Sequence, residues 1–323
     1  MNTKKFQTRK SGFTLVELLV AMTITIVLLG ILIFLTGISI DTYRDSRNEV
    51  RASRQAKEAI ETISRDLESM VLRKDGNNNE WLYAGEETSN LQGPSGKEIP
   101  NTSHLIFFTG ATDRYNGDIG GTTDQGGDVS AVSYRLVYRD QIADDDNGEF
   151  PVFSLYRHLI NPDEAFEELL AVEDLEGAYD TNFESDSFDP DNFLVENIYE
   201  FSVTFLVEVV VNTTGTPVTH TVRATMSPGN AIDEFTVTGS GIEYEGDIDF
   251  PSSSNLTKEQ VEGGSIVGVD ISITVLSDQG LILAQRSGIE PAELIRKHGF
   301  HYTKSITTPR PYGIILTLTS KSL

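Results

Sequence analysis

The sequence predicts an α+β fold, in which one long N-terminal helix packs on an antiparallel β-sheet head with long loops. The first observation is an uncharged apolar run from Leu18 to Ile40. The second is an amphipathic helical pattern that follows this run without proline or glycine until Gly76. The third is a series of short alternating segments beyond Gly76, which are separated by turn-forming loops.

The chain is long and strongly acidic. Its 323 residues are enough for one or two domains with a substantial core. The formal net charge of -24 disfavours a nucleic-acid partner, which requires a basic face. The absence of cysteine excludes disulfides, thiolate catalysis and cysteine metal sites.

The apolar run at the N-terminus is long enough to span a membrane. A helix from Leu18 to Ile40 is roughly 35 Å long, against about 30 Å for a hydrocarbon core. An ordinary secretory signal has a shorter apolar region that ends in a small-residue cleavage site, which this run lacks. A plain membrane anchor leaves the charge of Glu17 unexplained, because a carboxylate in lipid is unfavourable without a partner.

The stretch KSGFTLVELLVAM explains that charge better. It resembles the class III signal of type IV pilins and pseudopilins. In that signal a basic leader ends in Gly, and Phe follows, with Glu at the fifth position of an apolar helix. Here Gly12 ends the leader, Phe13 follows it, and Glu17 is fifth when counted from Phe13.

This resemblance implies a processing route and a location. Prepilin peptidase would cut after Gly12, remove the leader 1–12 and methylate the new amine of Phe13. Residues 13–40 would form a single-pass helix in the bacterial inner membrane, and later the filament core. The N-terminus would be cytoplasmic and the head periplasmic. Glu17 would pair with the Phe13 ammonium of a neighbouring subunit and set the axial register between the helices.

The helical pattern continues past the membrane segment through residues 41–75. We expect one helix from about Thr14 to about Arg73. Apolar residues at spacings of three and four predict a face that packs on the head: Ala56, Ile60, Ile63, Leu67, and Met70 or Val71. A coiled-coil stalk is the alternative interpretation of this half.

Residues 76–323 would form the β-rich head. Strands are predicted over residues 104–109, 129–140, 150–160, 196–211, 216–226, 265–278 and 313–320. Helices are predicted over residues 161–174, with Asn161 as cap, and 290–299. The polar segments 75–101, 115–128, 174–191 and 232–264 are expected to be surface loops. Strands that adjoin in sequence favour antiparallel pairing.

Four segments narrow the resemblance to the J-type minor pseudopilin of type II secretion. They are a helix like RQAKEAIETISRDLE, a strand pair like VSYRLVYRD and FSLYRHLI, a segment like LVENIYEFSVTF, and a late strand like GVDISITVLSD. The extra length and the acidic insertions depart from that pattern, and the chain also resembles the prepilin-like family labelled cassette protein C. The likeness implies a place near the filament tip. Its partners would be other major and minor pseudopilins and an inner-membrane assembly platform.

No pattern of catalytic residues stands out. The sequence has no H-E-x-x-H, G-x-S-x-G, P-loop or dinucleotide motif, and its histidines are scattered. We therefore expect neither an enzyme nor a required cofactor. Calcium takes several oxygen ligands, so two acidic clusters are calcium candidates, with Asp144, Asp146, Asp189 and Asp191.

Three functions remain open. The first is a structural one, a minor pseudopilin of a type II secretion-like pseudopilus. The second is a minor pilin of a type IV pilus, used in adhesion or DNA uptake, although the acidic surface disfavours direct DNA binding. The third is a membrane-tethered protein whose loops bind exported cargo.

Overall fold

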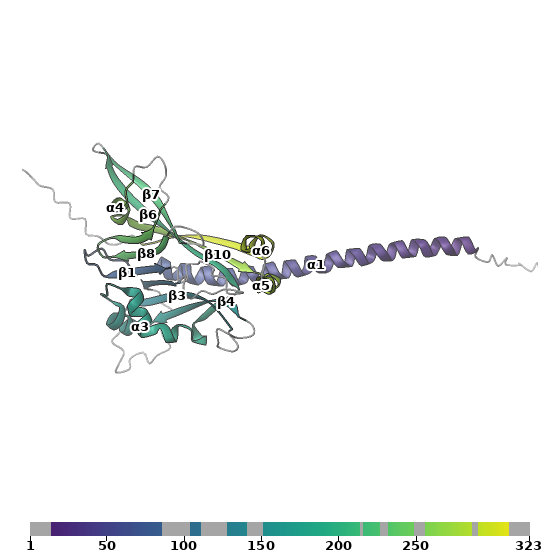
Figure 1. Ribbon diagram of the computed structural model, residues 1–323, viewed down its shortest axis with the longest axis horizontal. Coiled ribbons are helices and arrows are strands. Elements are labelled where there is room, and N and C mark those ends of the chain that lie inside the picture. The colour runs from purple at the N-terminus through teal and green to yellow at the C-terminus, as the bar shows by residue number, and fades with distance from the viewer. Residues whose placement is uncertain are drawn as a thin grey trace, which may run out of the picture. The chain divides into compact units, whose positions relative to one another are not determined.

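The structure is a computed structural model that describes residues 14–85, 104–110, 128–140, 151–213, 216–226, 232–248, 256–285 and 290–309. The chain divides into two compact units, Met1–Val50 and Arg51–Leu323. The first unit holds the apolar part of the N-terminal helix. The second holds the end of that helix and the sheets of the head (Figure 1).

Helix α1 extends over 54 residues, Leu15–Glu68. The unbroken helical pattern predicts this helix correctly, but the expected end at about Arg73 is wrong. The chain leaves the helix earlier because it begins to pair with strand β2 (His104–Thr109). The Val71 N–H donates to the Phe108 carbonyl at 2.8 Å, and an N–H bonded in this way cannot continue the helical ladder.

Two antiparallel sheets make up the described part of the head (Figure 1). The seven-stranded sheet has the order β5-β4-β3-β2-β1-β8-β9. Its strands, besides β2, are β1 (Glu80–Gly85), β3 (Ser130–Arg139), β4 (Val152–Ile160), β5 (Phe193–Glu196), β8 (Ile232–Thr238) and β9 (Ile242–Gly246). Strands β3 and β4, which contain VSYRLVYR and FSLYRHLI, pair with each other as that strand pair implies.

The four-stranded sheet has the order β11-β10-β6-β7. Its strands are β6 (Ile198–Thr213), β7 (Thr216–Met226), β10 (Ser265–Leu276) and β11 (Gly299–Thr307). Strands β6 and β7 lie over the predicted strands 196–211 and 216–226 and pair as a hairpin, and β10 is the predicted late strand. The antiparallel pairing expected from the order of the strands is confirmed in both sheets.

Asn197 carries the chain from one sheet to the other. It lies between β5 and β6 with a φ of 69°, in the left-handed region that Asn tolerates better than most residues with a side chain. Its N–H donates to the Phe153 carbonyl of the seven-stranded sheet at 2.7 Å. Its carbonyl accepts from the Leu276 N–H of the four-stranded sheet at 3.0 Å. These two backbone bonds join the sheets at this corner.

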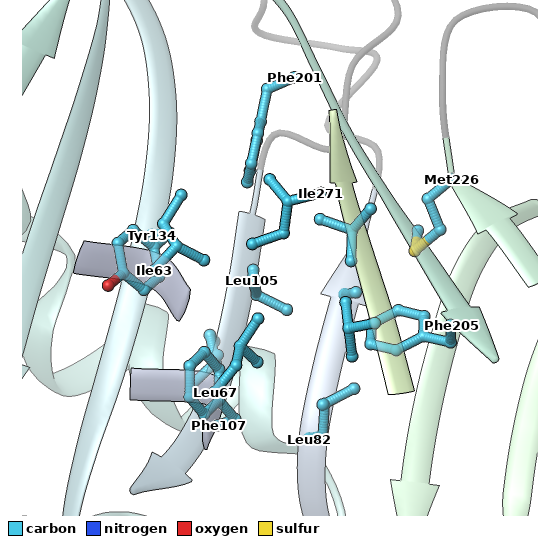
Figure 2. Packing of buried hydrophobic residues seen from close by; sticks show 14 of the residues in the cluster. Ile63, Leu67, Leu82, Leu105, Phe107, Tyr134, Phe201, Phe205, Met226 and Ile271 are labelled. Carbon is cyan, nitrogen blue, oxygen red and sulfur yellow. The ribbon is translucent and has the colours of Figure 1, made fainter. Parts of the chain in front are cut away.

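The core contains side chains from the end of α1 and from both sheets. Figure 2 shows Ile63 of α1 in one buried cluster with Phe107 of the seven-stranded sheet and Phe201 of the four-stranded sheet. The rings of Phe205 and Phe235 stack with their centroids 4.3 Å apart, which joins β6 to β8. Because each element buries its apolar face in the same cluster, the cluster fixes the helix and the sheets to one another.

Short helices complete the head. They are α2 (Pro162–Glu164), a π-helix over Ala165–Leu169, α3 (Leu175–Ser187), a 3-10 helix over Pro190–Asn192, α4 (Lys258–Glu262), α5 (Asp278–Ala284) and α6 (Pro291–His298). The helix predicted over residues 290–299 is α6. The one predicted over residues 161–174 is present in part, as α2 and the π-helix. Asn161 occupies the cap position of α2, but its side chain makes no capping hydrogen bond.

The acidic segment 174–191 is not the expected loop, because it forms α3. Its largest buried residues recur every four positions: Leu175, Tyr179 and Phe183. The Asp174 side chain caps the helix by accepting from the Gly177 N–H at 2.8 Å. Both signals are present in the sequence, but the many acidic residues between them mask the apolar spacing.

Two other segments expected as loops also contain regular structure. Residues 75–101 include strand β1, and residues 232–264 include the hairpin β8–β9 and helix α4. Strands β5 and β11 and helix α5 are not among the predicted elements. The predicted strand 313–320 and the predicted loop residues 115–127 lie outside the described residues.

Candidate functional site

Glu17 forms a reciprocal cap with Thr14 at the start of α1. The Glu17 Oε2 atom accepts from the backbone N–H and from the hydroxyl of Thr14, both at 2.9 Å. The Glu17 N–H donates to Thr14 Oγ1 at 3.3 Å. This capping box satisfies amide groups that have no partner in the first turn of a helix. The pattern T-x-x-E before an apolar run predicts such a cap, in addition to the expected pairing of Glu17 with a neighbouring subunit.

The cap leaves part of the Glu17 carboxylate free. Thr14 occupies Oε2, whereas Oε1 has no hydrogen-bond partner among the described residues. The side chain is exposed, so Oε1 is open to a cation. The expected source of that cation, Phe13, and the expected cleavage residue Gly12 lie outside the described residues. One carboxylate can thus cap its own helix and also bind an ammonium group of another chain.

The first part of α1 presents a continuous apolar surface. All residues from Leu15 to Ile40 are exposed, and this helix is long and apolar enough to cross a membrane. Its hydroxyl groups donate to carbonyl groups four residues earlier, at 2.8 to 2.9 Å, in Thr23, Thr25, Thr36 and Ser39. Because these hydroxyls are satisfied within the helix, the surface suits lipid or a bundle of similar helices.

The last part of α1 docks on the head through a buried stripe. Its buried residues are Ala52, Ala56, Ala59, Ile60, Ile63, Ser64, Asp66 and Leu67. This set includes Ala56, Ile60, Ile63 and Leu67, which are expected to face the head. Met70 is also buried, but it lies beyond the end of α1. The three alanines lie in the first turns of this stripe. The stripe therefore attaches the head to the helix mainly by apolar burial.

Asp66 is a charged residue within this buried stripe. Its carboxylate forms a bidentate pair with Arg157, with distances of 2.7 Å from Nε to Oδ2 and 3.0 Å from Nη2 to Oδ1. The Tyr134 hydroxyl donates to Oδ2 at 2.5 Å. Burial, and then the charge of Asp66, raises the pKa of Tyr134 well above its ordinary value, so the phenol keeps its proton. The three side chains tie α1 to β3 and β4.

Arg51, the first residue of the second unit, joins α1 to two more elements. Its Nη2 atom lies 2.7 Å from Oε1 of Glu196 at the end of β5. Its Nη1 atom lies 2.8 Å from Oδ1 of Asp278 at the start of α5. All three side chains are at least one-third exposed, so each pair stabilises little and serves mainly to orient the elements.

An open hollow of about 810 Å³ lies beside the π-helix. Its lining includes Arg73, Trp81, Phe108 and Phe166. Phe166 is 72% exposed, and the Arg73 guanidinium lies 5.4 Å from the centroid of the Trp81 ring. An exposed aromatic side chain next to a charged rim suits contact with a partner protein better than with a small polar ligand.

Only two of the four calcium candidates lie among the described residues. Asp189 and Asp191 lie on either side of Pro190 at the start of the 3-10 helix. Asp144 and Asp146 lie outside the described residues. In the part of the chain that the structure describes, no group of three or more His, Asp or Glu residues is placed to hold a metal ion.

Residues 7–33 match a family model, the prokaryotic N-terminal methylation motif. The matched stretch contains Gly12, Phe13 and Glu17. No curated protein and no solved structure matches the chain. The motif implies a substrate of prepilin peptidase that assembles from a membrane. Together with the long apolar helix α1 and the antiparallel sheets that follow it, the motif supports a type IV pilin-like protein.

Proposed function

We propose that the chain is a minor pseudopilin, a structural subunit of a type II secretion-like pseudopilus without catalytic activity of its own. The observation that carries the proposal is the position of Glu17, fifth from Phe13 and at the start of an exposed apolar helix. In this proposal α1 anchors the chain in the bacterial inner membrane, with the N-terminus cytoplasmic and the head periplasmic, until the filament assembles.

Glu17 has the assembly role in this proposal. After cleavage the amine of Phe13 in one subunit is a cation, and Oε1 of Glu17 in the next subunit is its partner. Either charge alone is unfavourable in a low-dielectric filament core, so neighbouring helices align where the two charges meet. The hydrogen bonds from Thr14 support this role, because they hold the carboxylate at the helix start.

The head supports a place at or near the tip of the filament. The four segments that resemble a J-type subunit correspond to the end of α1, the hairpin β3–β4, the strands β5 and β6, and strand β10. The chain contacts other major and minor pseudopilins through α1 and the head, and the assembly platform through its membrane segment. The aromatic hollow around Phe166 gives the head an additional surface for such contacts.

Leader processing is the first test of this proposal. Mass spectrometry of the N-terminal peptide should find methylated Phe13 in the unsubstituted chain. The Gly12→Ala variant should remain a full-length precursor in the membrane, whereas Ser11→Ala, a matched change beside the cleavage site, should be processed. Processing of Gly12→Ala at the normal rate would exclude the proposed class of protein.

Partner capture is the second test. The full-length chain, cross-linked in its own cells and purified from detergent, should bring down other minor pseudopilins of a secretion machine. The Glu17→Gln variant should bring down much less of them. Recovery of subunits of an extended pilus instead would show that the chain is a minor pilin.

A further inference from the structure

The hollow beside the π-helix has an apolar floor. This floor is the buried part of the lining and includes Trp81 of β1 and Phe108 of β2, whose rings meet edge-on with their centroids 5.5 Å apart. All lining residues belong to the second unit, so the hollow is a feature of the head alone. Its volume of about 810 Å³ is more than one side chain fills and lies in the range of pockets that hold ligands.

Trp81 brings to this hollow a polar group without a partner. The side chain is 5% exposed, and its Nε1 atom is buried with no hydrogen-bond acceptor among the described residues. Arg73 lies over the ring, but a guanidinium can only donate. A buried tryptophan N–H usually has an acceptor, because leaving it unpaired is unfavourable. A backbone carbonyl of a bound segment would supply that acceptor.

The π-helix leaves Phe166 in solvent at the edge of the hollow. Ala165 and Leu169 are buried, whereas Phe166 between them is exposed. The chain then continues through Ala171, whose φ of 70° is unfavourable for a residue with a Cβ atom. π turns and left-handed residues of this kind are rare and are concentrated at functional sites. This backbone, with its exposed phenylalanine, is explained if Phe166 contacts a partner.

The charged residues of the lining form an acidic rim. They are Asp128, Asp163 and Glu167, with Arg73 as the only basic residue in the described lining. Three carboxylates against one guanidinium leave an excess of two negative charges. An occupant with positive charge is therefore favoured, and anionic lipid is disfavoured. A second copy of this chain is also disfavoured, because each copy carries a net charge of -24.

We infer that the hollow is a docking site for an extended segment of a different, less acidic pseudopilin, in which a bulky apolar side chain is flanked by lysine or arginine. This inference rests on the proposed function and names the chemistry of one partner. The apolar side chain packs between Phe166 and the floor. The flanking cations meet the acidic rim, and a backbone carbonyl accepts from Trp81 Nε1.

Photo-cross-linking from the hollow identifies the occupant. The photoreactive residue p-benzoylphenylalanine is placed at position 166 of the full-length chain, which is expressed in its own cells, irradiated and purified from detergent. Mass spectrometry of the product should find a segment of another pseudopilin, with lysine or arginine beside an apolar residue. The same photoreactive residue in place of Ile282, an exposed apolar residue of α5, is the matched control and should not give this product.

Peptide binding then measures what each residue contributes. A synthetic peptide of the cross-linked segment is titrated into the full-length chain in detergent. Trp81 is the only tryptophan in the sequence, so its emission reports on the hollow and should change saturably. Phe166→Ala should weaken binding more than about tenfold, and Glu167→Lys about fivefold. Glu168→Lys makes the same change in charge one residue along the π-helix, outside the lining, and should bind like the unsubstituted chain.

Three results would overturn the inference. The absence of a product specific to position 166 would show that the hollow has no partner in the filament. A product with a second copy of this chain, or with an exported protein, would assign another occupant. Equal weakening by Glu167→Lys and Glu168→Lys would show that the rim does not select the cations.

Leader cleavage and capture of other subunits by the unsubstituted chain are measured in the same cells. If both persist while the cross-link is absent, only the docking site is wrong. If the unsubstituted chain shows neither, the proposed function is wrong.

Discussion

Asp66 of α1 and Arg157 of β4 form a bidentate ion pair inside the head, with 2.7 Å between Oδ2 and Nε. The Asp66 side chain is completely buried, and that of Arg157 is nearly so. A buried ion pair contributes little net stability, but removing one partner leaves the other charged and unpaired. The pair therefore joins α1 to β4, and the loss of either partner should destabilise this contact.

Asp66→Asn should lower the free energy of unfolding by about 3 kcal/mol, because the buried guanidinium of Arg157 would lose the carboxylate charge of Asp66. Denaturant unfolding of the full-length chain in detergent measures this. Arg157→Met should also destabilise, and the double variant should be less unstable than the sum of the two changes. Glu61→Gln, an exposed change on the same helix, is the control. Simple additivity of the two buried changes would show that the pair is not coupled.

The two roles of Glu17 can be separated by two variants. Glu17→Gln keeps an acceptor that can cap Thr14, since Gln also serves in a capping box, but it removes the charge. Incorporation into the filament should fall more than about tenfold, because the partner ammonium would be left unpaired in the filament core. Thr14→Ala removes the cap, weakens the first turn by about 1 kcal/mol and keeps the charge. Its incorporation should be close to normal. The reverse ranking, measured by the content of purified filaments, would assign Glu17 to capping alone.

Helix α1 and its buried face are predictable from local sequence, but the buried ion pair between Asp66 and Arg157 is not. The spacing of Ala56, Ile60, Ile63 and Leu67 is enough to define the buried face. Asp66 lies beside this face and would be expected in solvent, since a carboxylate is seldom buried without a partner. Its partners Tyr134 and Arg157 are 68 and 91 residues away, so no local pattern indicates them.

Two helix starts that the prediction lacks do have local signals in the sequence, but other features of the sequence favour a different interpretation. The Thr14 cap of Glu17 and the Asp174 cap of α3 each follow a known helix-start pattern. In the first case a resemblance offered another role for Glu17. In the second, acidic residues made the segment resemble a solvated loop, although its buried residues keep a spacing of four.

Glu80 should make the stability of the head depend on pH. Burial raises the pKa of its carboxyl from 4.5 to about 7 in the folded chain. Folding therefore favours the protonated form of Glu80. The contribution of Glu80 to the stability of the folded chain is fully present below about pH 4.5 and is lost as the pH rises through about 7. In the unsubstituted chain the Leu175 N–H donates to Glu80 Oε2 at 2.7 Å. Glu80→Gln keeps an acceptor for this N–H, but its side chain cannot ionise.

Unfolding measured at pH 5 and pH 8 tests this pH dependence. The unsubstituted chain should lose more stability between these two values than Glu80→Gln does, since only the former must accommodate a half-buried carboxylate. Glu58→Gln, a change at an exposed position of α1, should behave like the unsubstituted chain. An equal loss in Glu80→Gln and the unsubstituted chain would place the origin of the pH dependence in other groups.

Asn197 should be replaceable by glycine but not by alanine. Its φ of 69° is unfavourable for a residue with a Cβ atom, by about 1–2 kcal/mol for Asn197→Ala. Asn197→Gly removes that steric conflict but increases the freedom of the unfolded chain, so it should change stability by less than about 1 kcal/mol. Denaturant unfolding of the two full-length variants compares them. The backbone of Asn197 bonds to Phe153 in one sheet and to Leu276 in the other. If Asn197→Ala does not change the free energy of unfolding, the backbone at this position can relax without breaking either bond.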